Sequence, residues 1–426
     1  MATYDMFAPA RRHDRAGSTS TVAEALDAID DNTRVYVAPI CATPTALVEA
    51  IADDRNRWTR LEFVSDYLIH PLAVFDHAGD PFHHLSLQPS GAVSAMRDAG
   101  VLRTVAASYS QFARFIAPGG PVAADVALVQ VSPPGPDGKF SLGVGGGATI
   151  DAVRTTPLVI AEVNPQMPYT FGASELDRDE IDLLVDVDHP LTELVVPHAN
   201  DAALAIAAHA ATLIDDGSVL QFGIGSIPES ILAALSDRQD LGLHGGMISD
   251  AIVDLVDGGA VTGARKNTDT GLMITAAIAG TRKVFDWVHR NDTIRVVPSS
   301  YSHGLATLCK IEDFVAINSA LEIAGDGAVN AEMAGSRVVS GPGGQPDFAY
   351  AAWASPSGRS IIALPATAAR GTISRIVDSL AEGVTPTIGR YLVDDIVTEF
   401  GIARLGGLPV EERAAALLAI THPDFR

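Results

Sequence analysis

The chain has few lysines and a large excess of acidic residues. Among its 426 residues, 29 are Lys or Arg and 52 are Asp or Glu, which gives a net charge of −23. Only four residues are lysines: Lys139, Lys266, Lys283 and Lys310. A nucleic-acid partner needs a basic surface that follows the phosphate backbone, so we expect none here. An acidic surface also repels anionic ligands, so any phosphate site must use local arginines and backbone N–H groups.

Cysteine and long apolar runs are also scarce. The two cysteines, Cys41 and Cys309, are too few for a disulfide framework or a zinc cluster, which predicts a cytoplasmic location. Residues 1–17 lack the apolar core of a signal peptide, and the longest apolar stretch, 202–214, is too short to cross a bilayer. We therefore expect no secretion and no membrane partner. The histidines near His83 and His84 lack any zinc-binding spacing, so no metal is expected.

Short β-branched segments alternate with alanine-rich segments along the whole chain. Apolar residues make up 47% and charged residues 19%, an ordinary balance for a protein that folds throughout. The alternation predicts an α/β fold with parallel sheets covered by helices. In the first half, strands are predicted at 33–40, 125–132 and 157–164, with a helix at 46–54.

A change of composition near residues 187–203 marks the predicted domain boundary. Histidines and prolines there precede an alanine-rich helix at 201–214 and a strand at 218–222. We therefore predict two open α/β domains, 1–195 and 196–426. The second is predicted to contain helix 249–257, strand 293–298, strand 360–365, helix 372–381, strand 394–398 and helix 410–420.

The first candidate motif is a strand that runs through a glycine turn into a helix, at residues 219–230. Glycines at 223 and 225 let the backbone approach a ligand, and the helix N-terminus presents N–H groups to an anion. Ser226 is a candidate cap and Pro228 suits the first helical turn. Alone, the motif is a weak signal, and a plain strand-to-helix turn is the favoured alternative.

The second candidate motif is a glycine-rich loop at residues 340–348. Gly341, Gly343 and Gly344 are followed by Gln345 and Asp347, which gives exposed N–H groups and an amide suited to a thioester carbonyl or a pantetheine amide. A loop that only connects two elements is the alternative.

The third candidate motif combines a carboxylate with an amide. An apolar strand at 316–322 ends in Glu322, and Asn330 follows eight residues later, so the two side chains can share one cleft. The alternative is that Glu322 is a satisfied structural acid and Asn330 a turn residue.

These motifs occur in one order with other short signatures. They are residues 132–143, 162–168, 248–250, 398–405 and 422–426. The set resembles the acetyl-CoA hydrolase/CoA-transferase family, in particular the 4-hydroxybutyrate and butyrate–acetate CoA-transferases. The resemblance covers nearly the whole chain. It implies two α/β domains with the active site in the cleft between them, an acyl-CoA substrate, coenzyme A only as part of that substrate, no permanently bound cofactor, and a homo-oligomer.

The resemblance also implies roles for individual residues. Asn330 matches the auxiliary amide near the reacting carbonyl, and the N–H of Gly371 matches a donor of the oxyanion hole. The CoA-binding positions that it implies are Gly223, Ile224, Gly225, Ser226 and Ile227 in the first loop, Gly343, Gly344 and Gln345 in the second, and Arg370 beside Gly371.

One position departs from the family. Its transferases carry a His-Thr-Glu-Met run before Ile-Ser-Asp, and that glutamate attacks the acyl-CoA. Here the run is His244-Gly245-Gly246-Met247, so Gly246 takes the glutamate position. Because a glycine has no carboxylate to carry the acyl group and then CoA, exchange through a glutamyl-CoA intermediate at this position should be abolished.

We therefore expect an acyl-CoA hydrolase, or an enzyme of a related reaction, without a glutamyl intermediate. Glu322 and His244 are candidates for general acid/base catalysis, and no Gly-x-Ser-x-Gly elbow supports a serine nucleophile. Two alternatives remain: CoA transfer to a carboxylate with Glu322 as nucleophile, and a non-catalytic CoA-ester-binding protein.

Overall fold

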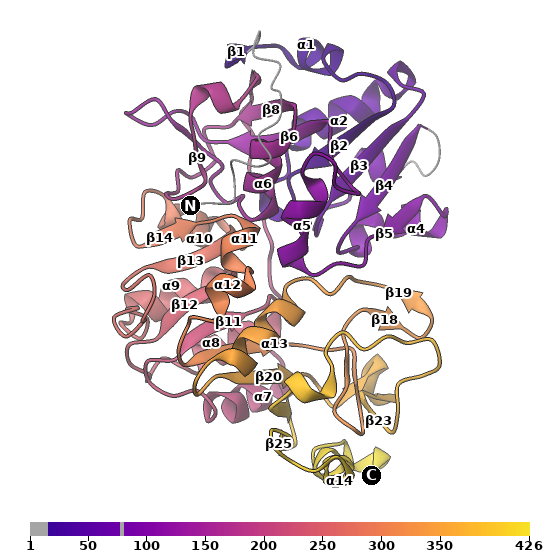
Figure 1. The fold of residues 1–426 in the computed structure, drawn as a ribbon, viewed down its shortest axis with the longest axis vertical. Helices are drawn as coiled ribbons and strands as arrows, with labels where there is room; N and C mark the ends of the chain where they lie inside the picture. The colour runs from indigo at the N-terminus through magenta and orange to yellow at the C-terminus, as the bar shows by residue number, and fades with distance from the viewer. Residues whose placement is uncertain (1–15, 77–80) are drawn as a thin grey trace. The chain divides into compact units, whose positions relative to one another are not determined.

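The computed structural model describes residues 16–76 and 81–426 (Figure 1), so the signal-peptide prediction, which rests on residues 1–17, falls almost wholly outside the described part. The chain divides into two compact units. Unit 1 comprises residues up to Leu194 together with Thr275–Ser300, and unit 2 comprises Val195–Ile274 and Tyr301–Arg426. The first division lies next to the predicted boundary at 195/196. The grouping of Thr275–Ser300 with unit 1 differs from the predicted second domain, whose limits stay a prediction.

Unit 1 contains a parallel sheet with strands in the order β1-β10-β8-β6-β2-β3-β4-β5. Its central strands are buried along their whole length, which fits their mostly apolar sequences; Gln130 in β6 and Glu162 in β8 are the exceptions. The bounds are β1 Ser18–Thr19, β2 Thr33–Val37, β3 Leu61–Ser65, β4 Phe82–Ser86, β5 Leu102–Thr104, β6 Val126–Val131, β8 Leu158–Val163 and β10 Leu183–Asp186.

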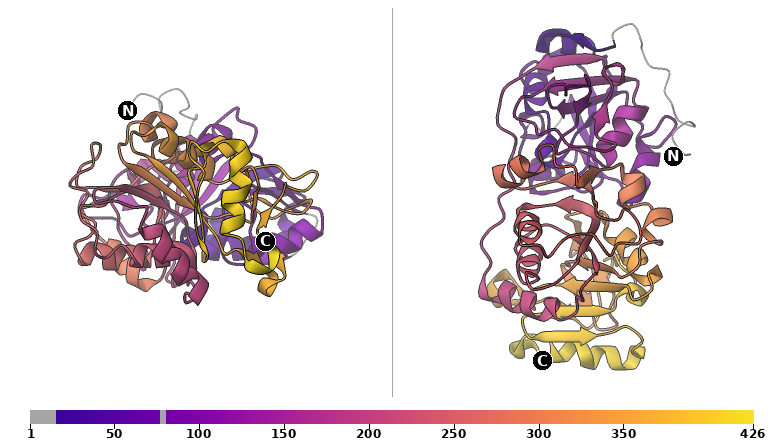
Figure 2. Two further views of the ribbon diagram at one scale, coloured as in Figure 1. Left: turned by 90° about the horizontal axis from the view of Figure 1, so that it is seen from below. Right: turned by 90° about the vertical axis from the view of Figure 1, so that its left-hand side faces the viewer.

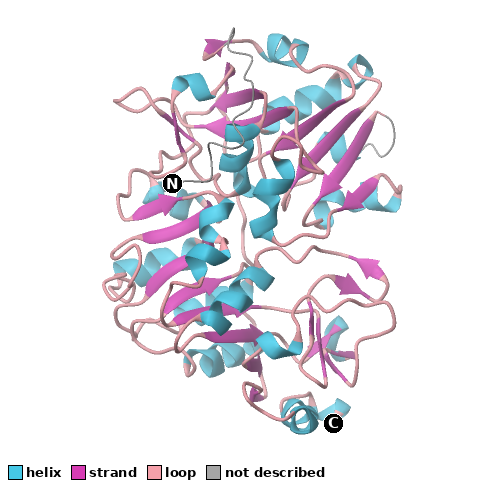
Figure 3. Cartoon of the chain, viewed as in Figure 1, coloured by secondary structure: helices cyan, strands magenta, loops and turns pink. Residues whose placement is uncertain are grey.

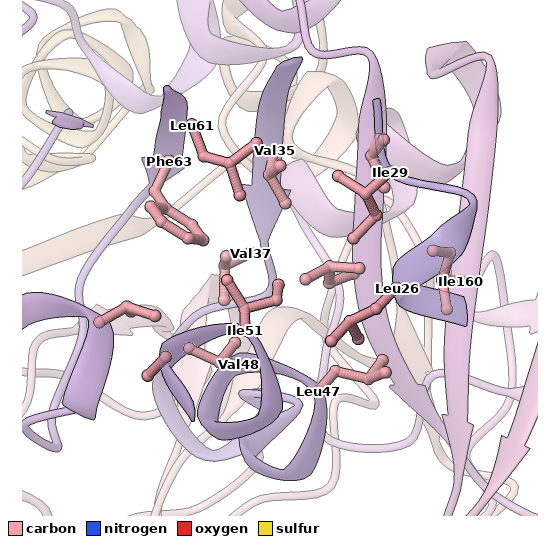
Figure 4. Close-up of a cluster of buried hydrophobic side chains, with 14 of the residues drawn as sticks. Leu26, Ile29, Val35, Val37, Leu47, Val48, Ile51, Leu61, Phe63 and Ile160 are labelled. Atoms are coloured by element: carbon pink, nitrogen blue, oxygen red, sulfur yellow. The ribbon is translucent and has the colours of Figure 1, made fainter. Parts of the chain in front are cut away.

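Helices pack on this sheet and build the core of unit 1. Leu26, Leu47 and Ile51 from two helices meet Val35 and Phe63 from the strands (Figure 4). The helices are α1 Val22–Asp27, α2 Thr45–Asp53, α3 Ala73–Asp76, α4 Ser94–Asp98, α5 Tyr109–Ile116 and α6 Ala148–Thr155. A small antiparallel pair, β7 Phe140–Ser141 with β9 Glu175–Leu176, also lies in the segment up to Leu194. The segment assigned from Thr275 to Ser300 includes α10 Arg282–Val288 and β14 Ile294–Val296, and β13 spans Met273–Ile278.

Unit 2 contains six described strands in the order β12-β11-β15-β20-β24-β25, seen with their helices in Figure 3. The first five are parallel, and only the last pair is antiparallel. The bounds are β11 Val219–Phe222, β12 Gly242–Ile248, β15 Phe314–Asn318, β20 Arg359–Ala363, β24 Asp395–Thr398 and β25 Gly401–Arg404.

Helices and small sheets surround these six strands. The helices are α7 Asp201–Ala211, α8 Ser226–Ala233, α9 Asp250–Asp257, α11 Ser299–Ser302, α12 Leu305–Leu308, α13 Gln345–Ala354 and α14 Val410–Ala419. Figure 2 shows α14 lying along β25 at the C-terminal end of the unit, a packing that the contacts between the two elements confirm. The small strands are β16 Glu322–Ala324, β17 Val329–Asn330, β18 Met333–Ala334, β19 Arg337–Val338, β21 Thr367–Ala368, β22 Ile373–Ser374 and β23 Ile376–Val377.

The predicted helix at 372–381 is wrong. Strands β22 and β23 occupy this segment, where β22 pairs with β21 and β23 pairs with β16. The segment is rich in β-branched residues, which pack well in strands and lose rotamer freedom in helices. Apart from the strand predicted at 316–322, the other predicted helices and strands are present, with ends that differ by a few residues.

The predicted strand at 316–322 is also corrected. Strand β15 ends at Asn318, and Glu322 begins the separate strand β16. The intervening turn redirects the chain, so Glu322 does not continue the parallel sheet.

Three further observations concern the described residues. None of their helices has both the length and the apolar character needed to cross a bilayer. Their His, Cys, Asp and Glu side chains form no group of three or more that is arranged to hold a metal ion. Both cysteines are free thiols, Cys41 buried and Cys309 exposed.

Candidate active site

The site in unit 2 begins at a point where the strand order reverses. From β11 the chain first adds β12 on one side, and it later returns to place β15 on the other side. In open parallel sheets, ligands bind outside the carboxyl ends of the strands at such a point. The amides of Gln221 and Asn318 pair across the carboxyl ends of β11 and β15, with Asn318 Nδ2 donating to Gln221 Oε1 at 3.1 Å. The two strand ends are thereby held together beneath the candidate site.

The first glycine loop follows β11 directly. Gly223 to Ile227 are half-buried, and Gly225 forms the N-cap of α8 with φ 122° and ψ 173°, a conformation almost restricted to glycine. The prediction that Ser226 caps this helix is wrong: Ser226 is its first residue, and no side chain caps the end. The uncapped N-terminal N–H groups give this loop the properties of an anion-binding turn.

The second glycine loop precedes α13. Gly343 has φ 55°, Gly344 forms the N-cap, and Pro346 lies in the first turn of the helix. Gln345 Nε2 donates to the backbone oxygen of Ser319 at 3.1 Å, which ties the start of α13 to the chain that leaves β15. The start of α13 is therefore tied to the chain that follows β15, the strand paired with β11.

Gly246 lies near the carboxyl end of β12 and is half-buried. A Cβ built on Gly246 would lie 3.1 Å from Nε2 and 3.2 Å from Cε1 of His303, and 3.8 Å from Cε2 of Phe348. The imidazole of His303 therefore takes up the space in which a side chain at position 246 would begin.

The same imidazole lies against Gly344. A Cβ on Gly344 would lie 2.5 Å from Cδ2 and Nε2 of His303 and 2.8 Å from Cε2 of Phe348. Any larger residue at position 344 would overlap these rings, so the close approach requires glycine. The imidazole is further held by Ser302, whose Oγ lies 2.9 Å from Nδ1, and by the Phe348 ring at 4.5 Å between centroids.

His303 is a neutral ring at ordinary pH. It is only 3% exposed, and burial lowers its pKa to about 3, with a smaller contribution from nearby His244. Removing an imidazolium from water disfavours the charged form, which explains the direction.

His244, the acid/base candidate from the sequence, is completely buried in β12. Burial, followed by the charge of Lys266, lowers its pKa to about 3. The backbone of Tyr301 and Ser302 lies near the ring and opposes this lowering of the pKa. Neither ring nitrogen, however, is close enough and well enough aligned to form a hydrogen bond with a described residue. Because the ring does not reach solvent, its proposed catalytic role stays a prediction without support from its position.

Lys266 and Tyr301 border the buried histidines. Lys266 Nζ donates to the backbone oxygens of Leu243 at 3.0 Å and Leu272 at 2.6 Å, and burial lowers its pKa to about 8. Tyr301 OH donates to the carboxylate of Asp269 at 3.1 Å. The Tyr301 hydrogen bond ties the segment that carries His303 to Asp269.

The structure brings Glu322 and Asn330 together, as their spacing predicted. They are opposite each other in the β16–β17 pair, and Asn330 Nδ2 donates to Glu322 Oε1 at 2.9 Å. The other Nδ2 hydrogen goes to the backbone oxygen of Met333 at 2.7 Å, while Oδ1 accepts from the N–H groups of Glu332 and Met333. Both amide hydrogens of Asn330 are therefore in use, which favours a role in holding Glu322.

The segment around Gly371 has an unusual backbone. Ala369, Arg370 and Gly371 all have positive φ, at 49°, 58° and 87°. For Ala369 and Arg370 this conformation costs about 1–2 kcal/mol each, and such strain concentrates at functional sites. The segment is exposed, and the predicted oxyanion role of Gly371 and CoA role of Arg370 stay predictions.

Sequence reasoning missed His303, Ser302 and Phe348. Their signal is weak because His303 lies in a short serine-rich segment far from Gly246 in the chain. Only the fold places its imidazole between Gly246 and Gly344. The sequence feature that points to His303 is its place shortly after the strand predicted at 293–298.

The chain matches the acetyl-CoA hydrolase/transferase N-terminal domain over residues 11–192 and the C-terminal domain over residues 280–426. The 4-hydroxybutyrate coenzyme A transferase of Clostridium kluyveri is 36% identical over 413 residues, which are 95% of this chain and 95% of that protein.

Two solved structures extend the similarity to the fold. RipA from Yersinia pestis superposes with a TM-score of 0.87 at 30% identity, covering 99% of this chain and 95% of that chain. The 4-hydroxybutyrate CoA-transferase of Porphyromonas gingivalis gives a TM-score of 0.79 at 31% identity, covering 96% and 95%.

The chain belongs to the acetyl-CoA hydrolase/transferase family. The predicted family and the α/β fold class are thereby confirmed. Family members are CoA-transferases or acyl-CoA hydrolases, and CoA thioesters are the substrates of the transferases. The assignment of Gly246 to the position of the nucleophile stays an interpretation from the residues.

Proposed function

We propose that this protein acts on an acyl-CoA thioester without a glutamyl-CoA intermediate, by hydrolysis or a related reaction at the thioester. The observation that carries the proposal is at position 246, which has no side chain and faces an imidazole. A carboxylate must be present at this point to carry the acyl group and CoA in turn. Here the nearest groups are the rings of His303 and Phe348.

The two glycine loops supply the binding half of the proposal. The N-termini of α8 and α13 present N–H groups that suit a phosphate, a pantetheine amide or a polarised thioester oxygen. On a chain with a net charge of −23, such local donors are what a CoA ester requires. The relatives of known activity support coenzyme A as part of the substrate.

A second candidate function is CoA transfer with Glu322 as a substitute nucleophile. Glu322 is half-buried and its Oε1 accepts from Asn330, so the carboxylate is oriented by a specific contact. The same contact occupies one of its two oxygens. A third candidate, non-catalytic binding of a CoA ester, would need only the glycine loops.

One screen separates these functions. A panel of acyl-CoAs is tested for release of free thiol with and without an acceptor acid, and each reaction is trapped with borohydride or hydroxylamine for mass spectrometry. Thiol release without acceptor and without a modified glutamate is expected. A modified glutamate would contradict the proposal and favour transfer, whereas binding without any turnover would favour the third function.

Two properties of the whole protein are part of the proposal. The two free cysteines support action in the reducing cytoplasm. Assembly as a homo-oligomer follows from the family resemblance, and sedimentation of the purified protein tests it.

A further inference from the structure

We propose that the outer face of α13 is the surface through which two copies of this chain associate. Three aromatic side chains of unit 2 form this surface, which we call the aromatic patch. They are Tyr350 and Trp353 on α13, and Tyr391 on the short 3₁₀ helix Arg390–Leu392. Such an association goes beyond the proposed thioester chemistry, because it would hold whichever reaction the protein catalyses.

The aromatic patch exposes large rings that lie next to one another. Trp353 is 68% exposed, Tyr391 is 65% exposed and Tyr350 is 39% exposed. Tyr350 and Trp353 are three residues apart on one helix, so their side chains point to the same side. The hydroxyl oxygens of Tyr350 and Tyr391 are 3.2 Å apart and share a hydrogen bond. Contiguous exposed rings of this kind mark an interaction surface more often than a plain solvent face.

The ring of Tyr391 is held in place although it is exposed. A Cβ built on Gly389 would lie 2.7 Å from Cε1 and 3.2 Å from Cζ of Tyr391, so the ring packs closely on the backbone of Gly389. The hydrogen bond to Tyr350 fixes its other end. A surface that is already ordered loses less conformational freedom on binding. Tyrosine and tryptophan are also the residues that most often supply the binding energy of an interface.

The charge of the chain favours a second copy as the partner. With a net charge of −23, two copies repel each other over most of their surfaces. Helix α13 lies wholly within the described residues, and none of its exposed side chains is charged, because its one acid, Asp347, is buried. Beside the patch, Arg390 pairs with Asp326 at 2.9 Å, so the two charges balance. Two like-charged chains therefore meet at low electrostatic cost through this face.

Other partners fit the patch less well. A basic protein would gain more from the acidic surface elsewhere on the chain than from an uncharged face. A membrane with anionic lipids would repel the chain as a whole.

The size of the patch suits the centre of a dimer interface. With about 150–250 Å² for each whole aromatic side chain, the exposed parts of the three rings amount to roughly 300–400 Å² per copy. A standard interface buries about 800 Å² per partner. The patch therefore supplies about half of that area, as an apolar centre with a polar rim around it does. In a two-fold dimer the same patch faces itself, so α13 of one copy would meet α13 of the other.

The main test places a charge in the aromatic patch. The parent should sediment as a dimer, or as an assembly of dimers, in analytical ultracentrifugation of the full chain over a range of concentrations. Trp353→Glu and Tyr391→Glu should each raise the Kd of association about 30-fold or more. Leu204→Glu, which changes an exposed leucine on α7, should associate as the parent does. Thermal melting shows that each variant is folded.

A glycine pair tests the patch without an added charge. Gly389 has φ −67° and ψ 142°, which alanine adopts readily, so Gly389→Ala acts chiefly by displacing the Tyr391 ring. This variant should also associate more weakly than the parent. Gly91→Ala is the matched control, because its Cβ would meet no described atom within 4 Å. The pair remains informative where a glutamate variant does not fold.

The outcomes separate this surface from the other proposals. If the parent sediments as a monomer at every concentration, the expected homo-oligomer and this surface both fail, while the proposed thioester chemistry stands. If the parent associates and Trp353→Glu, Tyr391→Glu and Gly389→Ala associate equally well, the interface lies elsewhere and only this inference fails. Absence of thiol release by the parent would overturn the proposed function and leave this surface untouched.

Discussion

Placing a glutamate at position 246 tests how firmly the imidazole of His303 holds its place. The Cβ of Gly246→Glu would lie 3.1 Å and 3.2 Å from two ring atoms, tighter than the 3.4–4 Å of ordinary contacts. The ring must therefore move by a few tenths of an ångström. Ser302, Phe348 and the backbone of Gly344 oppose that movement.

The expected cost follows from this crowding. Overpacking of this kind costs about 1–3 kcal/mol, and each kcal/mol lowers Tm by about 2–4 °C for units of this size. Gly246→Glu should therefore melt roughly 2–12 °C below the parent. Gly246→Ala separates the contribution of the Cβ contact from that of the added carboxylate. His303→Ala should relieve the contact. The double variant Gly246→Glu/His303→Ala should therefore be more stable than the sum of the two single losses of stability predicts.

Scanning calorimetry and acetate-dependent CoA exchange measure the two consequences. Exchange should be weak in Gly246→Glu and stronger in Gly246→Glu/His303→Ala, with a trapped glutamate at position 246. If Gly246→Glu melts with the parent and the two substitutions add within about 0.5 kcal/mol, the imidazole is not the obstacle and the steric reasoning is refuted.

Three further predictions concern single residues. Gly344→Ala should lower Tm more than Gly246→Ala, because its Cβ would lie 2.5 Å from His303 rather than 3.1 Å; equal melting in calorimetry would contradict this. Gly225→Ala should weaken CoA-ester binding in calorimetry, because its backbone conformation costs about 1–3 kcal/mol for a residue with a side chain; unchanged binding would remove this loop from the site. Asp66 in unit 1 is fully buried, and burial raises its pKa from 3.8 to about 7 despite a hydrogen bond from Tyr109. The folded state therefore binds this proton more tightly, so stability should fall as pH rises from about 4 to 7. Asp66→Asn should flatten that slope in urea unfolding, and an unchanged slope would assign it to other groups.

The sequence was sufficient for the elements whose pattern is local. Buried strands such as β6 and β8 are mostly apolar runs, and the glycine turns before α8 and α13 are visible in the sequence as glycine-rich segments. The helix predicted at 372–381 failed because its residues pair with β21, which lies just before them in the chain, and with the distant strand β16. The pairing with β16 depends on the tertiary fold, which a local pattern does not reveal.

The candidate site was predictable only in part. Glu322 and Asn330 are close in sequence, and their spacing correctly placed them together. The contact of His303 with Gly246 depends on two loops that meet only in the folded sheet, so no local pattern announces it. Likewise, the burial of His244 follows from its place inside β12 rather than from its neighbours in the chain.

The two glycines that border one imidazole have a consequence for how this site can evolve. A glutamate at residue 246 would meet the ring, and a larger residue at position 344 would meet it from another direction. Each change alone therefore costs stability until the ring itself is exchanged for something smaller. Sequences that carry this histidine should keep both small neighbours with it.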